Sequence, residues 1–74
     1  MDIVLNGIYR HYKGNYYKVI ALGKHTETTE DLVVYMALYG NNDVWCRPLN
    51  IWNNEIEIDG KKLKRFELIK DYNG

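Results

Sequence analysis

The chain has 74 residues, and its ten basic and ten acidic side chains give a formal net charge of zero. A chain of this length buries only about 60% of its unfolded surface, so we expect residues 1–74 to form one domain with a thin core. Zero net charge counts against a domain dedicated to nucleic acid, which normally carries a basic footprint. Cys46 is the single cysteine, which excludes an intrachain disulfide.

No targeting or membrane segment is visible at the sequence level. Met1 to Asn6 lacks the basic start and the long apolar core of a secretory signal. The longest apolar run, Leu32 to Tyr39, is too short to span a membrane as a helix. We therefore expect a cytoplasmic protein without a membrane partner.

The first two predicted strands form a hairpin around Gly14-Asn15. Ile8 to Lys13 and Tyr16 to Leu22 are β-prone runs, and Gly-Asn between such runs is typical of a two-residue turn. That turn places Tyr12 opposite Tyr17. The predicted core face comprises Ile8, Tyr12, Tyr17, Val19 and Ala21, and the other face comprises Tyr9, His11, Lys13, Tyr16 and Lys18.

The apolar run Leu32 to Tyr39 is predicted to be the central strand, apolar on both faces, before a turn at Gly40 to Asp43. A short strand, Val44 to Arg47, ends at Pro48, which cannot donate to a strand ladder. The segment Leu49 to Asn54 predicts one helical turn that plugs an open end of the fold.

A second hairpin follows, because Asp59-Gly60 suits a type I′ turn. One face of this hairpin is apolar, and the other carries opposite-charge pairs worth about 0.2–1 kcal/mol each. The predicted pairs are Glu55 with Lys64, Ile56 with Leu63, Glu57 with Lys62, and Ile58 with Lys61. Phe66, Leu68 and Ile69 continue the apolar face, and Lys70 to Gly74 is expected to fray.

Five to six short antiparallel strands, one short helical turn and frequent turn signals predict an all-β fold. In this size range a small SH3-like barrel fits best, with an OB-like barrel as the alternative. Closing the barrel would remove sheet edges that expose unpaired backbone groups.

Five groups of segments share a pattern with one known family. They are Gly7 to Asn15, His25 to Thr28, Val33 to Tyr35 with Leu38 to Gly40, Trp45 to Pro48, and Asp59-Gly60 with Arg65 to Glu67. Together, over about residues 7–69, they resemble the short bacterial domains grouped as domain of unknown function 1653. The chain departs from that pattern at Thr26, Cys46 and Lys64, where the family favours Ser, Val and Pro. The resemblance implies a bacterial protein with a compact SH3-like barrel, and it implies no established activity.

The polar and aromatic residues inside those segments are the candidate ligand-binding site. They are Arg10, His11, His25, Glu27, Tyr35, Trp45 and Arg47. Arginine forks bind carboxylates and phosphates, and aromatic faces stack on bases or guanidinium groups. A purely structural role is the alternative, in which Glu27 pairs with Arg10 or Arg47 and Trp45 belongs to the core.

We expect no catalytic residues, no metal and no other cofactor. A thiol nucleophile at Cys46 would need hydrogen-bond contact with His11 or His25 and an orienting third group. Cys46 on a strand instead fits a small buried residue. Two histidines and one cysteine without close spacing make no tetrahedral metal site.

Three functions remain open, none of them enzymatic. The preferred one is a binding module for a small anionic or peptide-like ligand, or for a protein partner. The second is a small-barrel module for single-stranded RNA or DNA, favoured by the lysines and tyrosines of the first hairpin. The third is a structural domain that forms homo-oligomers through an aromatic interface. The sequence identifies no partner.

Overall fold

A computed structural model describes residues 3–69. This part of the chain contains seven strands in two antiparallel sheets and one helical turn, which confirms the predicted all-β class. The elements are β1 (Ile8–His11), β2 (Tyr16–Lys24), β3 (Asp31–Ala37), β4 (Val44–Pro48), α1 (Leu49–Trp52), β5 (Glu55–Ile58), β6 (Lys61–Lys64) and β7 (Phe66–Leu68).

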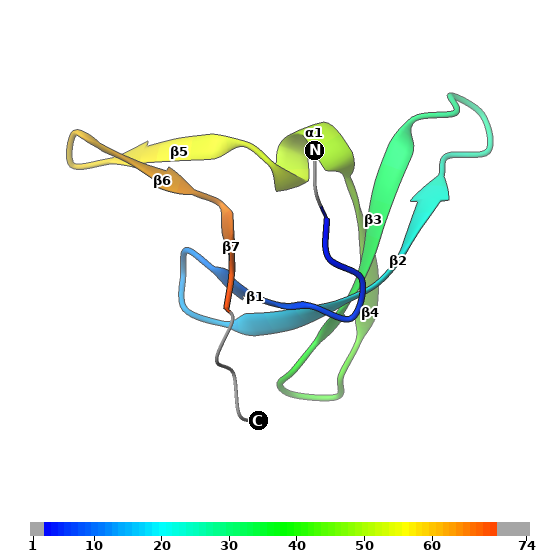
Figure 1. Cartoon of the computed structure of the whole chain (residues 1–74), viewed down its shortest axis with the longest axis horizontal. Coiled ribbons are helices and arrows are strands. Elements are labelled where there is room, and N and C mark those ends of the chain that lie inside the picture. The colour runs from blue at the N-terminus through cyan, green and yellow to red at the C-terminus, as the bar shows by residue number, and fades with distance from the viewer. Residues whose placement is uncertain (1–2, 70–74) are drawn as a thin grey trace.

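The larger sheet has the strand order β4-β3-β2-β1-β7 and curves beneath α1 (Figure 1). We call the face that α1 covers the concave face. The predicted central strand is confirmed as an interior strand, since β3 pairs with both β2 and β4. Val33, Tyr35 and Ala37 are buried, while Val34 and Met36, which alternate with them, are half-buried. β3 is therefore apolar on both faces, as its sequence predicts.

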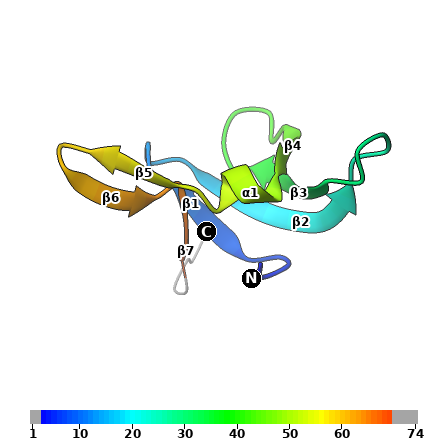
Figure 2. The same cartoon turned by 90° about the horizontal axis from the view of Figure 1, so that it is seen from above.

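The sheets do not close into a barrel, so that part of the prediction is wrong. Within residues 3–69, β4 and β7 are the two edges of the larger sheet, and β5 and β6 pair only with each other. Pro48 and α1 lead the chain away from the β4 edge. The β5–β6 hairpin consequently extends outward from the sheet instead of joining it (Figure 2).

The β5–β6 register is confirmed at all four predicted pairs. Asp59 and Gly60 have φ angles of 54° and 78°, the two positive values that a type I′ turn requires. The strand pairing then changes at Arg65, whose N–H donates to the carbonyl of Asn54 (3.0 Å). Phe66 consequently leaves the hairpin and opens β7, which pairs with β1. The predicted frayed end, residues 70–74, lies outside the described residues.

The predicted register of the β1–β2 hairpin is wrong. The N–H of Gly14 donates to the carbonyl of His11 (2.7 Å), and the N–H of His11 donates to the carbonyl of Asn15 (2.8 Å). The loop is therefore three residues long, with Gly14 at positive φ (110°). Tyr9 now lies opposite Tyr17, three residues from the predicted partner. An odd shift exchanges the faces of β1, so Tyr9 becomes core and is 5% exposed.

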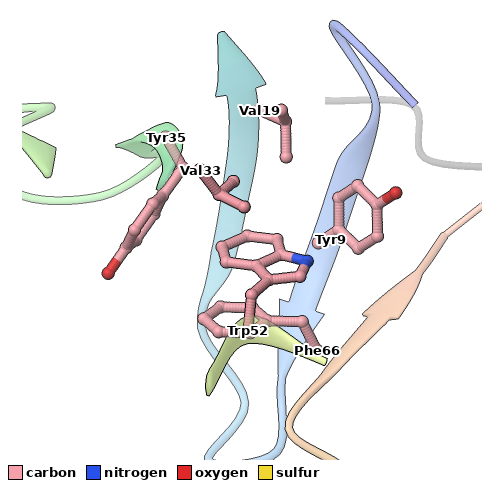
Figure 3. Close-up of a cluster of buried hydrophobic side chains, with 6 residues drawn as sticks. All are labelled: Tyr9, Val19, Val33, Tyr35, Trp52 and Phe66. Atoms are coloured by element: carbon pink, nitrogen blue, oxygen red, sulfur yellow. The ribbon is translucent and has the colours of Figure 1, made fainter. Parts of the chain in front are cut away.

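Aromatic rings form most of the core on the concave face (Figure 3). Trp52, only 2% exposed, stacks on Phe66 with ring centroids 3.7 Å apart. Tyr9 and Tyr35 pack edge-on against Trp52 at 5.4 and 5.0 Å. Val19 and Val33 complete the cluster. The predicted helical turn is thus confirmed, and its structural role is to place Trp52 against the sheet.

Candidate functional site

Beside the buried core, the concave face carries a group of tyrosines and cations. We call it the basic–aromatic cluster. It comprises His11, Tyr17, Tyr35, Tyr39, Arg47, Arg65 and Phe66. His11 on β1 pairs with Phe66 on β7, and their rings are in contact. Tyr17 on β2 contacts Tyr35 on β3, and Arg47 on β4 lies over the ring of Phe66. Residues far apart in the sequence therefore converge here through the sheet register.

Arg47 is held in one orientation by two neighbours. Its Nε donates a hydrogen bond to the hydroxyl of Tyr35 (3.3 Å). Its guanidinium carbon lies over the ring of Phe66, 5.5 Å from the centroid, a cation–π geometry. Arginine has five N–H donors, and no carboxylate within residues 3–69 forms an ion pair with Arg47. Arg47 is thus positioned while most of its donors remain available.

His11 lies in a positive environment. Its Nδ1 accepts a hydrogen bond from the backbone N–H of Lys13 (3.2 Å), and its ring meets Phe66 edge-on at 4.9 Å. Burial lowers the pKa of His11, and the charges of Arg47, Arg65 and Lys13 lower it further. The neutral imidazole, with its proton on Nε2, is therefore the favoured form at neutral pH.

Tyr17 and Tyr39 form a hydrogen-bonded pair beside the cations. Their hydroxyl oxygens are 2.7 Å apart and share a hydrogen bond, and the Tyr17 ring also meets Tyr35 edge-on at 5.3 Å. Burial, followed by the hydrogen bond with Tyr39, raises the pKa of Tyr17 to about 12. The Tyr17 phenol therefore stays neutral well beyond the ordinary range and adds no negative charge to balance the arginines.

Arg65 connects β6 to β7 and has an unsatisfied donor. Its Nε is buried and meets no hydrogen-bond acceptor in the described part of the chain. Its backbone is fixed, because its carbonyl accepts the N–H of Tyr12 (3.0 Å). A buried unpaired donor on a charged group is costly and calls for an acceptor.

Of the seven candidate residues predicted from the sequence, His11, Tyr35 and Arg47 lie together in the cluster. Trp45 pairs with Tyr35 across β3 and β4 and so shares its face. It is 53% exposed at the sheet edge, which contradicts the core interpretation of this tryptophan. Arg10 alternates with His11 along β1 and points to the opposite face, where Glu67 and Tyr16 are its strand partners.

His25 and Glu27 lie elsewhere, in the loop between β2 and β3 at the far end of β2 from Tyr17 (Figure 1). The Nδ1 of His25 accepts the backbone N–H groups of Glu27 (3.1 Å) and Thr28 (3.4 Å), so this imidazole shapes the loop. The expected pairing of Glu27 with Arg10 or Arg47 is wrong for the described residues. The ion pair at this end of the strands joins Lys24 to Asp31 (2.6 Å).

The buried position predicted for Cys46 is also wrong. Cys46 is exposed, and its strand β4 is an edge of the larger sheet within residues 3–69. It pairs with Val34 and therefore points away from the face that carries Tyr35 and Arg47. Cys46 is consequently remote from the imidazole of His11.

An open groove of about 430 Å³ lies between the β5–β6 hairpin and the ends of β1 and β7. Its lining mixes both charges: Arg10, Lys62 and Lys64 with Glu55 and Glu67, beside His11, Tyr12 and Leu63. Because carboxylates offset the cations, this groove has less preference for an anion than the basic–aromatic cluster.

Sequence reasoning missed four residues of the cluster: Tyr17, Tyr39, Arg65 and Phe66. Arg65 and Phe66 were noted within a family segment, but only the change of strand partner at Arg65 brings Phe66 under Arg47. The sequence predicts Tyr39 only as the end of the apolar run Leu32 to Tyr39. A pairing between Tyr17 and Tyr39 requires the β2–β3 register, which the sequence alone does not give.

Among residues 3–69, no group of three or more His, Cys, Asp or Glu side chains could hold a metal ion. The only helix in the same part of the chain is one short turn, and none there is long and apolar enough to cross a membrane.

The family described as protein of unknown function DUF1653 has a model that matches residues 7–68. The chain belongs to this family. The crystal structure of a DUF1653 protein from Bordetella bronchiseptica is similar to it, with a TM-score of 0.82 and 33% sequence identity over 96% of this chain and 94% of that one. The resemblance inferred from the sequence segments is thus confirmed. No curated protein matches this DUF1653 chain.

Proposed function

We propose that this domain is a non-enzymatic binding module whose basic–aromatic cluster takes a ligand bearing an oxyanion, a carboxylate or a phosphate. The observation that carries the proposal is the convergence of His11, Arg47 and Arg65. The charges of Arg47 and Arg65 both lower the pKa of the His11 imidazole, and neither arginine forms an ion pair with a carboxylate within residues 3–69. The buried Nε of Arg65 adds a donor that lacks an acceptor.

The chemistry of these groups suits an oxyanion. Planar guanidinium groups donate paired hydrogen bonds to carboxylates and phosphates, and such charge-assisted bonds are about twice as strong as neutral ones. Phe66 and Tyr35 hold the Arg47 guanidinium in place, which reduces the entropy lost on binding. A bound anion would also offset the repulsion that now disfavours protonation of His11.

A binding role is preferred to catalysis because the cluster contains no activated nucleophile. The thiol of Cys46 points to the other face of the sheet from Tyr35 and Arg47. The Tyr17 phenol, with its pKa raised to about 12, is protonated at neutral pH. Neither group meets the requirement of a nucleophile in contact with a base.

The nucleic-acid alternative receives less support. It depended on tyrosines and lysines of the first hairpin acting as an exposed stacking surface. Tyr9 is core, and the ring of Tyr17 is surrounded by other aromatic rings, which leaves Tyr16 as the exposed tyrosine of the two strands. The balanced charge of the chain counts against this alternative as well.

The test is a histidine NMR titration with inorganic phosphate, acetate and phenyl phosphate, in a buffer free of other oxyanions. We expect a bound anion to raise the pKa of His11, because a nearby negative charge favours the imidazolium form. The imidazole shift of His25, at the far end of β2, serves as an internal control. If the His11 titration curve stays the same with all three probes, the proposal is wrong.

Matched arginine variants locate the site. Arg47→Gln removes the guanidinium and should weaken phosphate binding about 10-fold or more, the range of a lost charge-assisted bond. Arg10→Gln removes the same charge from the opposite face of β1 and should leave affinity unchanged. Equal losses in both variants would indicate non-specific attraction. Binding of a short single-stranded RNA with a steep salt dependence would instead favour the nucleic-acid function.

A further inference from the structure

Strand β4 is an open edge of the larger sheet as formed by residues 3–69. Its ladder partner is β3, and its chain continues directly into α1. Val44 and Trp45 are 58% and 53% exposed, and Cys46 is exposed beside them. Natural edge strands are normally blunted by lysines, inward charges or bulges, because free backbone groups invite another strand. Proline is a further such device, and β4 carries Pro48 and the inward-facing Arg47 in its second half. Its exposed first half, Val44 to Cys46, carries no charge, proline or bulge.

The hydrogen-bond pattern shows which backbone groups face outward. The N–H of Ala37 donates to the carbonyl of Asp43 (2.9 Å), so the backbone of Asp43 points toward β3. Because the direction alternates along an antiparallel strand, Trp45 and Arg47 also point toward β3. Val44, Cys46 and Pro48 therefore point outward. Pro48 fits this alternation, because its backbone nitrogen faces away from β3 and the absent N–H removes no hydrogen bond to that strand.

These outward groups are complementary to a second copy of themselves. In an antiparallel pairing centred on Trp45, Val44 of each chain exchanges both ladder bonds with Cys46 of the other. A pairing centred on Cys46 would instead oppose Val44 to Pro48, whose nitrogen cannot donate, and leave a Val44 carbonyl unpaired. Of these two registers, the ladder groups therefore favour the one centred on Trp45.

Side chains agree with this register. Trp45 lies opposite Trp45 of the second copy, and aromatic cross-strand pairs stabilise sheets. Asp43 lies opposite Arg47 of the second copy, so opposite charges meet at both ends of the ladder. An arbitrary peptide would not supply this symmetric match of donors, acceptors, rings and charges.

We propose that the domain forms a two-fold symmetric dimer in which the β4 strands of two copies pair antiparallel about Trp45 and join the two sheets. The ladder itself does not require the proposed anion site, since its hydrogen-bonding groups are the backbones of Val44 and Cys46, but it would bring a carboxylate opposite Arg47 and so compete with an anion for that side chain. It also places an exposed tryptophan and two exposed apolar side chains in an interface, where a monomer would leave them in water.

The first measurement is the mass of the protein by sedimentation equilibrium over a range reaching about 1 mM, because a single-strand interface belongs to the small, weak class. We expect the mean mass to rise from one chain toward two. Cys46→Pro removes an outward N–H without touching the β3 ladder and should abolish the rise. Cys46→Ser is the matched control and should dimerise as the parent does. Amide spectra of both variants verify that the fold is retained.

Disulfide trapping tests the register. In a Cys46→Ser background, Trp45→Cys places two thiols opposite one another in a non-hydrogen-bonded pair with Cα atoms about 4.5 Å apart, within disulfide range. Val44→Cys in the same background places them on a diagonal about 7–8 Å apart. With oxidised glutathione as the oxidant, the first variant should form the covalent dimer faster. A single-chain mass at every concentration, or a dimer that survives Cys46→Pro, would overturn the proposal, and equal trapping would overturn the register.

Discussion

The two tryptophans differ in exposure because Trp52 lies on α1, which packs onto the sheet, and Trp45 lies on the edge strand β4. Trp52 is 2% exposed and stacked on Phe66, whereas Trp45 is 53% exposed. Trp52→Ala should lower the free energy of unfolding by about 3–5 kcal/mol. That is the whole stability expected of a domain of this size, so we expect the variant to be unfolded at 25 °C.

Trp45→Ala is the matched control for this prediction. A surface substitution normally changes stability by no more than about 0.5 kcal/mol. Urea unfolding at low protein concentration, where association does not contribute, compares the two variants. A Trp45→Ala variant as unstable as Trp52→Ala would contradict the assignment of the core tryptophan.

Tyr17 makes stability depend on alkaline pH. Its pKa is raised from 10.0 to about 12 in the folded chain, so the native state holds this proton more tightly than the unfolded state. The stabilisation is fully present below pH 10 and is lost as the pH rises from 10 to about 12. Urea unfolding at a series of alkaline pH values should show this decline.

Tyr17→Phe identifies the group responsible for the alkaline loss. The variant lacks both the titrating phenol and the hydrogen bond with Tyr39, so its stability should start lower at neutral pH and fall less steeply above pH 10. Tyr12→Phe removes a phenol outside the hydroxyl pair and should behave as the parent. If both variants keep the parental slope, Tyr17 is not the source of the decline.

At the scale of the element, the sequence predicted a hairpin register correctly where the turn itself determined it. Asp59-Gly60 requires two positive φ angles in adjacent residues, and few arrangements other than the type I′ turn satisfy that. Gly14 also has positive φ, but a glycine serves a two-residue and a three-residue loop equally well. The choice there follows from packing Tyr9 against Trp52, a contact between residues far apart in the chain.

The candidate site was predictable to the extent that its residues lie on confirmed strands. His11, Tyr35 and Arg47 were chosen from family segments, and the sheet brings them together. His25 and Glu27 belong to segments of the same kind, but they lie in a loop at the other end of β2, and spacing along the chain carries no information about that distance. The place of Arg65 in the cluster depends on a change of strand partner that no local sequence pattern predicts.

At the scale of the molecule, the β5–β6 hairpin should open independently of the larger sheet. Among residues 3–69, β5 and β6 pair only with each other, and Ile58 and Leu63 remain exposed. The larger sheet, in contrast, contains the fully buried Val19 and Val33. Regions with few buried apolar contacts open at a fraction of the global free energy. The hairpin is therefore expected to be a separate unit of low stability.

Amide hydrogen exchange measures this difference directly. The ladder amides of Ile58 and Leu63 should exchange at least about 10-fold faster than those of Lys18 and Met36 in the β2–β3 ladder, because the latter require global unfolding. Low concentrations of urea should accelerate exchange of the sheet amides, because global unfolding exposes a large surface. Exchange of the hairpin amides should hardly change, because opening of the hairpin exposes little surface. Hairpin amides as protected as Met36 would show one cooperative unit. Independent opening would widen the groove that the hairpin borders while leaving the basic–aromatic cluster intact.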